Sequence, residues 1–166
     1  MTTAITNLDV HDIARSARTY GVGDFFVVHP VAAQRKLAER IRSHWVEGSG
    51  KDRIPDRAEA LERVRVVASL EEARAALVGA GPPPEVWATA AAARAGPVTP
   101  YAEARERLGV DGAAVMILFG TGWGLARELC AGADLRLEPI RAVAETGYNH
   151  LSVRAACAIT LDRLLG

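Results

Sequence analysis

Cysteines and long apolar runs are scarce in this sequence, and each scarcity excludes a class of protein. The two cysteines, Cys130 and Cys157, lie in helix-like sequence and show neither metal-ligand spacing nor a disulfide framework. We therefore expect two reduced core cysteines and no metal site. No apolar stretch is long enough to span a bilayer and no signal peptide is evident, so we expect a cytoplasmic protein without a membrane partner.

An excess of charge of either sign is also lacking. The chain has 20 basic and 20 acidic residues and a net charge of +0, whereas a strong non-specific nucleic-acid binder is usually basic. A local basic face is still compatible with this balance. Only Lys36 and Lys51 are lysines, and the many arginines either serve bidentate phosphate contacts or reflect a codon bias toward Ala and Arg.

Apolar runs of strand length alternate with helical segments along the 166 residues. The predicted strands are 24–29, 65–68, 86–90, 114–119 and 135–140. The predicted helices are 7–20, 31–46, one that starts at a capping box of Ser69 and Glu72, 99–108 and 149–165, with a loop at 47–57. This alternation predicts an α/β fold in which helices cover both faces of a mostly parallel sheet.

The most distinctive motif is Phe119-Gly-Thr-Gly-Trp-Gly-Leu125, which follows the fourth of these strands. Three glycines at a corner between a strand and a helix leave backbone donors and carbonyls uncovered. A nucleotide-like ligand could lie directly on that backbone. The sequence therefore places the candidate site late in the chain.

A dinucleotide-binding oxidoreductase is one interpretation of this motif. The usual fingerprint opens its domain and has an acidic residue about 20 residues further on. Here the nearest match is Glu138, which comes 14 residues after Gly124. Glu138 either accepts hydrogen bonds from a ribose or is a surface carboxylate before a turn.

Four segments together resemble the SPOUT RNA methyltransferases, most closely a small stand-alone subfamily that depends on S-adenosylmethionine (SAM). These segments are residues 6–22 (TNLDVHDIARSARTYGV), 119–125 (FGTGWGL), 137–140 (LEPI) and 148–154 (YNHLSVR). The resemblance covers essentially the whole chain. It implies SAM as cofactor, tRNA or rRNA as substrate, a homodimer, and a C-terminal deep trefoil knot. It also implies one domain over 1–166, in which the family's usual first strand ahead of residues 3–6 is lost or its start codon is misplaced.

The resemblance places a cofactor cleft at three loops, where main-chain groups hold the adenosyl part of SAM. The residues it implies are Phe119, Gly120, Thr121, Gly122 and Gly124 in the first loop, Glu138, Pro139 and Ile140 in the second, and Asn149, His150, Leu151 and Ser152 in the third. Asn149 is also a natural N-cap of the closing helix. Ser152 either contacts the cofactor or packs within that helix.

The catalytic candidates are Arg15, Asp9 and His11, which lie in the first segment. Arg15 matches a family arginine that holds a phosphate or stabilises the deprotonating nucleophile; the alternative is a solvated surface arginine. Asp9 is a general base or stabilises the start of its helix, and His11 could act near neutral pH.

We expect Arg18, Arg154 and Trp123 to contact RNA. Trp123 could instead cover the cofactor or pack in the core, and Arg154 could be an ordinary exposed arginine. The motifs depart from those of the ribose-methylating branch, so ribose oxygen and base nitrogen both stay open as the methylated atom. The second motif lacks that branch's glutamate, which is the best support for a non-catalytic binding module.

Overall fold

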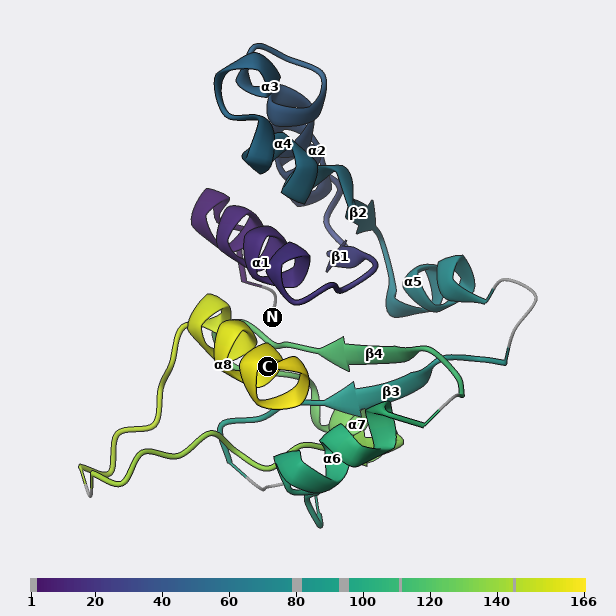
Figure 1. Cartoon of the computed structure of the whole chain (residues 1–166), viewed down its shortest axis with the longest axis vertical. Helices are drawn as coiled ribbons and strands as arrows, with labels where there is room; N and C mark the ends of the chain where they lie inside the picture. Colours follow the sequence, from purple (N-terminus) through teal and green to yellow (C-terminus); the bar gives the residue numbers. More distant parts are fainter. Residues whose placement is uncertain (1–2, 79–81, 93–95, 111, 145) are drawn as a thin grey trace. The chain divides into compact units, whose positions relative to one another are not determined.

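The computed structural model describes residues 3–78, 82–92, 96–110, 112–144 and 146–166 (Figure 1). The described chain forms two compact units, Met1–Ala76 and Leu77–Gly166. The boundary falls within helix α5 (Leu70–Leu77), so neither unit ends at a loop. The expectation of a single domain over 1–166 stays a prediction, and each unit is described by itself below.

The first unit packs helices around a short parallel sheet. Its elements are α1 (Asn7–Thr19), β1 (Phe25–Val28), α2 (Ala32–Val46), α3 (Gly50–Arg53), α4 (Pro55–Glu62) and β2 (Val64–Val67). Phe25 pairs with Val64 and Val28 with Val67, so β1 and β2 run parallel in register. The buried positions of α1 recur at helical spacing and contact β1 and α4, as an amphipathic helix requires.

The expected loop at 47–57 is wrong, because α3 and the start of α4 lie within it. Pro55 does not break a helix here. It begins α4, where its missing N–H group costs nothing and its fixed φ suits the first turn. Gly50 is buried against the Trp45 ring, where an added Cβ would lie 2.6 Å from the ring atom Cε3. The glycine and proline therefore serve close packing and helix initiation in this segment.

The core of the first unit gives a direct test of its packing. Leu61 of α4 is 0% exposed, whereas Leu8 of α1 is 60% exposed. We expect Leu61→Ala to lower the free energy of unfolding by about 2–5 kcal/mol, since it removes buried methyl groups and leaves a cavity. Leu8→Ala is the control and should change it by about 0.5 kcal/mol at most. Urea unfolding measures both, and equal effects would contradict this assignment of the core.

The second unit is built on a three-stranded sheet. Its elements are β3 (Glu85–Ala88), α6 (Tyr101–Leu108), β4 (Val115–Leu118), α7 (Arg127–Ala131), β5 (Leu135–Arg136) and α8 (Val153–Leu165). The strand order is β4-β3-β5, and both pairings are parallel. Trp87 of the central strand is 0% exposed and anchors a core with Tyr101 and Leu164.

Both cysteines belong to this unit and both are buried. Burial raises the pKa of the Cys157 thiol to about 11, because a thiolate is poorly solvated among apolar neighbours. Cys157 is therefore protonated at neutral pH. The expectation of core cysteines is confirmed.

The predicted α/β class with parallel strands is confirmed, and the first four strands start and end within about two residues of their predicted limits. Ser69 and Glu72 form the predicted capping contacts, with Ser69 Oγ accepting from Glu72 N at 3.2 Å. The fifth strand is shorter than predicted. It ends at Arg136, apart from an isolated bridge between Thr99 and Leu137, and beyond it Glu138 N donates to Thr99 O and no longer to β3.

Candidate cofactor and RNA site

The three strand ends of the second unit meet at one edge of its sheet. Ala88 at the end of β3 pairs with Leu118 of β4 on one side and with Arg136 of β5 on the other. Neighbouring strands lie about 4.8 Å apart, so the chain leaves β4 and β5 about 10 Å apart, with the end of β3 between them. Ligands of parallel α/β sheets bind at this carboxyl edge. The structure thus brings the first two predicted cofactor loops together with the loop after β3.

The first loop, residues 119–124, folds back on itself. Gly124 N donates to Thr121 O at 3.1 Å, and Gly122 and Gly124 have φ values of 57° and 84°, which favour glycine. An added Cβ on Gly120 would lie 2.4 Å from the Gly124 carbonyl carbon. The glycines are therefore required by the loop's own closure. Phe119 and Gly120 are half-buried, whereas Thr121, Gly122 and Gly124 are exposed.

Trp123 lies in the turn of this loop and is 87% exposed. The alternative in which it packs in the core is wrong, because most of its side chain is exposed to solvent. An exposed indole next to the strand edge is still available to a ligand.

The second loop is tied to the start of α6. The Oε1 atom of Glu138 accepts a hydrogen bond from Tyr101 N at 3.0 Å, and Glu138 N donates to Thr99 O at 3.0 Å. One carboxylate oxygen therefore satisfies a backbone donor in the first turn of a helix, where negative charge is favourable. Pro139 is buried and Ile140 packs against the core around Trp87. Glu138 is half-buried and bound to the start of α6, so it is more than the surface carboxylate of the second alternative, and a contact with a ribose stays a prediction.

The third segment corrects the predicted start of the closing helix. Helix α8 begins at Val153, and Ser152 is its N-cap, with Ser152 Oγ accepting from Ala155 N at 3.3 Å. Asn149 is not the N-cap, because Ser152 lies closer to the first helical turn and supplies the same acceptor. Its amide instead donates to Ala91 O at 2.8 Å. This bond joins the third segment to the loop after β3, a contact that nothing in the sequence indicated.

The side chains of the third segment face solvent to different degrees. Leu151 is 48% exposed and His150 is exposed, while Asn149 is half-buried by its bond to Ala91. Arg154 in the first turn of α8 is half-buried. All twelve predicted cofactor residues thus belong to segments at or tied to one edge of the second unit's sheet, and cofactor contact itself stays a prediction.

The catalytic candidates lie on α1 of the first unit. Thr6 is the N-cap of this helix, and its hydroxyl accepts from Asp9 N at 3.2 Å while donating to the Asp9 carboxylate. This reciprocal pair resembles a capping box, in which both side chains satisfy the start of a helix. The geometry favours the helix-stabilising alternative for Asp9.

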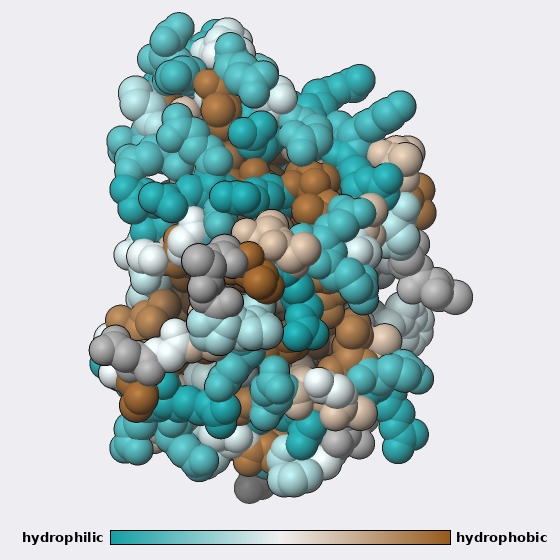
Figure 2. All heavy atoms as spheres, turned by 90° about the vertical axis from the view of Figure 1, so that its right-hand side faces the viewer, coloured by the Kyte–Doolittle hydropathy of each residue, from teal (hydrophilic) through white to brown (hydrophobic). Residues whose placement is uncertain are grey.

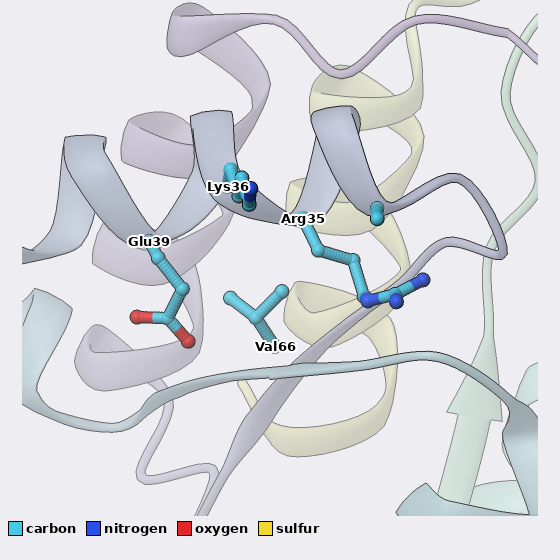
Figure 3. Close-up of a pocket in the computed structure, with 5 residues that line it drawn as sticks. Arg35, Lys36, Glu39 and Val66 are labelled. Atoms are coloured by element: carbon cyan, nitrogen blue, oxygen red, sulfur yellow. The ribbon is translucent and has the colours of Figure 1, made fainter.

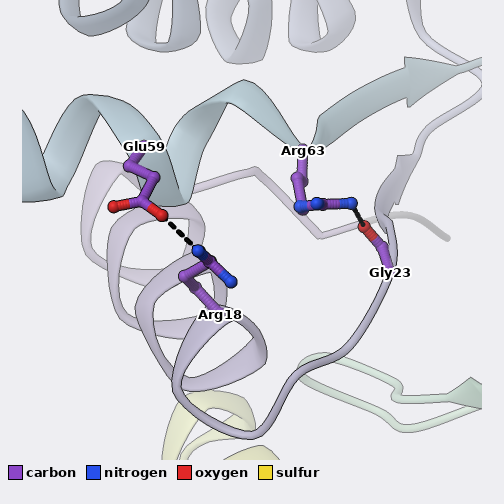
Figure 4. Close-up of polar contacts among 4 residues, drawn as sticks. All are labelled: Arg18, Gly23, Glu59 and Arg63. Carbon is purple, nitrogen blue, oxygen red and sulfur yellow. Dashed lines mark hydrogen bonds and ion pairs between the residues drawn. The ribbon is translucent and has the colours of Figure 1, made fainter.

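Arg15 and Arg18 differ in their surroundings on α1. Arg15 is exposed, and among the described residues no ion pair holds it. Arg18 pairs with Glu59 of α4, its Nε atom lying 2.9 Å from Oε1, while Arg63 Nη1 donates to Gly23 O at 3.1 Å (Figure 4). An RNA phosphate would have to compete with Glu59 for Arg18. Exposed pairs of this kind contribute about 0–1 kcal/mol, so such competition is feasible.

His11 packs in an aromatic and cationic cluster between helices of the first unit. Its ring meets Trp45 edge-on at 5.5 Å between centroids, and the Arg57 guanidinium lies 4.7 Å from the Trp45 centroid. The Nδ1 atom of His11 is buried and has no hydrogen-bond partner among the described residues. Burial lowers the pKa of His11 below its ordinary 6.5, and the positive charge of Arg57 lowers it further. His11 is therefore neutral at pH 7.

The lowered pKa of His11 predicts how the protein responds to pH. As the pH falls through 6.5, the unfolded chain takes up a proton before the folded chain does, so this residue makes the free energy of unfolding decrease with decreasing pH. We expect Arg57→Gln to raise the pKa of His11, and Arg57→Lys to leave it low because the charge remains. Nuclear magnetic resonance titration of the His11 ring measures both. An unchanged pKa in Arg57→Gln would contradict the assigned electrostatic contribution.

The first unit also contains an open surface hollow of about 390 Å³ that the sequence did not indicate. Arg35 and Glu39 extend from α2 on either side of Val66 of β2 (Figure 3). Arg35 is already bound, since its Nη1 atom donates to His29 O at 2.8 Å and to Pro30 O at 2.7 Å. None of the predicted site residues lines this hollow.

Polar and apolar groups are intermixed at the surface. Hydrophilic side chains dominate the face drawn in Figure 2, and hydrophobic groups show between them.

Within the described parts of the chain, no three His, Cys, Asp or Glu side chains are grouped as metal ligands would be. In those same parts, no helix combines the length and apolar character needed to cross a bilayer.

Comparison with known proteins identifies a family to which this chain is similar. A family model described as SAM-dependent RNA methyltransferase matches residues 1–166. The chain is 46% identical over 168 residues to a tRNA (guanine-N(1)-)-methyltransferase of Nitratidesulfovibrio vulgaris, covering 99% of this chain and 37% of the relative. It is 35% identical to an uncharacterized protein of Aquifex aeolicus, covering 98% of this chain and 78% of that relative.

A solved structure supports the fold. A probable methyltransferase from Bordetella pertussis Tohama I has a TM-score of 0.66 and 22% identity, covering 99% of this chain and 89% of that one. The chain thus spans little more than a third of the N. vulgaris relative, which is a longer protein, but most of the A. aeolicus and B. pertussis proteins.

Proposed function

Since the chain belongs to the SAM-dependent RNA methyltransferase family, we propose that it transfers a methyl group from SAM to an RNA, with tRNA as the first candidate substrate. The observation that carries this proposal is the family match over residues 1–166, which contain the glycine loop and the two segments beside it. The name of the N. vulgaris relative, a tRNA methyltransferase, favours tRNA over rRNA. The family match gives no support to the oxidoreductase interpretation.

In this proposal, the carboxyl edge of the second unit's sheet holds the cofactor. Main-chain groups of 119–124 and 138–140 would hold the adenosyl part, and the segment 149–152 would hold the other end. The loop closure around Gly120 and the bond from Asn149 to Ala91 support it, because both keep main chain fixed at that edge without a ligand. SAM supplies the activated methyl group, so the protein needs to align the nucleophile and accept its proton.

Three further properties are part of the proposal. We expect a SPOUT-type C-terminal knot and a single domain over 1–166, supported by the resemblance of the four motif segments to that superfamily. We expect a homodimer, which would place the same surface patch of each copy in contact. Because tRNA is the proposed substrate, we expect the protein to work in the cytoplasm. Light scattering of the purified chain tests the dimer.

The test of the function uses the full chain, SAM labelled at its methyl group, and bulk tRNA and rRNA as separate substrates. Transfer to tRNA, followed by mass mapping of the modified nucleoside, would support the proposal and identify the methylated atom. Binding of S-adenosylhomocysteine without transfer to any RNA would refute the enzyme and favour the binding module. Transfer to rRNA alone would support the proposed methyl transfer but would replace tRNA with rRNA as the substrate.

A further inference from the structure

Two aromatic rings stand exposed on the segment that precedes α8. Tyr148 is 75% exposed and His150 is exposed, and their ring centroids lie 5.3 Å apart with planes inclined by 58°. The two residues flank Asn149, whose side chain donates to Ala91 O. Since the two exposed rings lie this close together, they share one solvent-facing side of this segment.

The segment that carries the two rings is tied to the loop after β3 by one long-range hydrogen bond, with local bonds on either side of it. Asn149 Nδ2 donates to Ala91 O at 2.8 Å, and Tyr148 N donates to Thr146 Oγ1 at 3.2 Å. Ser152 then fixes the chain to the start of α8. Rings on an anchored segment lose less conformational freedom when a ligand binds to them than rings on a free tail do.

The sequence around the two rings carries a small excess of positive charge. Arg141 is exposed seven residues before Tyr148, and the half-buried Arg154 follows in the first turn of α8. From Arg141 to Arg154, the sequence contains two arginines and one acidic residue, Glu145. The N-terminal end of α8, a helix of 13 residues, adds partial positive charge. Exposed rings in a basic segment are a combination with which proteins bind single-stranded nucleic acid.

We propose that Tyr148 and His150 form a stacking platform for unpaired bases of a single-stranded RNA segment. The inference rests on the proposed function, and it deepens it by naming the part of the RNA that the protein selects. It gives the His150 ring an RNA contact, while the main chain of 149–152 keeps its proposed contact with the cofactor. Every base has a flat face, so this platform is tolerant of sequence, but it discriminates against duplex RNA, whose bases are already stacked.

Fluorescence anisotropy with a labelled single-stranded 12-mer RNA, and with a duplex of the same length, tests the proposal. We expect Tyr148→Ala to weaken binding of the single strand by about 5- to 100-fold and Tyr148→Phe to restore it, because stacking needs the ring and not the hydroxyl. Val143→Ala is the matched control, since Val143 is 100% exposed just before the pair and has no ring to stack.

Calorimetry with S-adenosylhomocysteine separates this inference from the proposed function. If Tyr148→Ala keeps its cofactor affinity but loses single-strand affinity, the platform is supported. Equal loss for single strand and duplex would indicate phosphate recognition and overturn it, as would unchanged RNA affinity or a loss of cofactor affinity alone. If the unmodified protein binds neither S-adenosylhomocysteine nor RNA, the proposed function fails.

Discussion

Gly120→Ala is expected to weaken binding of S-adenosylhomocysteine by about 10- to 100-fold, since overpacking typically costs about 1–3 kcal/mol. The added Cβ would lie 2.4 Å from both the Gly124 carbonyl carbon and the Leu125 nitrogen. Both neighbours are backbone atoms, so no side chain can swing aside to make room. The loop must open, and its main-chain groups move from the positions that the proposed cofactor site requires.

Isothermal calorimetry gives the affinity, and thermal unfolding shows whether the variant is folded. Gly23→Ala is the matched control, because Gly23 has no positive φ and an added Cβ there meets nothing within 4 Å. The control should bind like the unmodified protein. A folded Gly120→Ala with full affinity would remove the 119–124 loop from the cofactor site.

Arg15→Ala should lower kcat/KM for methyl transfer by about 100- to 1000-fold, the range seen when one group that stabilises developing charge is removed. Cofactor affinity should change by no more than about twofold, because the proposed role of Arg15 is toward the RNA and not toward SAM. Arg15 is exposed and no ion pair among the described residues holds it, so its guanidinium is available to a phosphate or to the nucleophile.

Two variants sharpen this test. Arg15→Lys should recover part of the activity, since it keeps the charge but loses the planar, two-pronged donor. Arg40→Ala removes an exposed arginine of α2 that belongs to no predicted site, and should leave transfer intact. Single-turnover kinetics separate the chemical step from binding. Normal turnover in Arg15→Ala would exclude Arg15 from the proposed catalytic role.

The sequence predicted strands and helices best where one local pattern decides the outcome. Val115–Leu118 is an uninterrupted apolar run, and it forms β4 almost as predicted. The predicted loop at 47–57 is wrong, because the glycines and the proline in this segment do not break its helices. Their actual roles depend on neighbours that are distant in sequence or on position within a helix: Gly50 fits against Trp45, and Pro55 occupies a first turn.

The candidate site likewise has features that the sequence predicts and features that it does not. The glycine loop could be predicted from the sequence because its unusual composition lies within one short segment. The bond from Asn149 to Ala91 joins residues 58 positions apart, and no spacing rule predicts such a contact. Asn149 and Ser152 are both good N-cap residues, so propensity alone could not choose between them. Only the start of α8 at Val153 decides for Ser152.

The two buried thiols have a practical consequence for labelling. Maleimides react with thiolates, and the Cys157 thiol with its pKa of about 11 is both protonated and shielded at neutral pH. Cys130 is also buried. A single cysteine introduced by Val143→Cys, at a side chain that is 100% exposed, should therefore carry a dye selectively without removal of either native cysteine. Such a dye would report on the segment beside Tyr148 as RNA arrives.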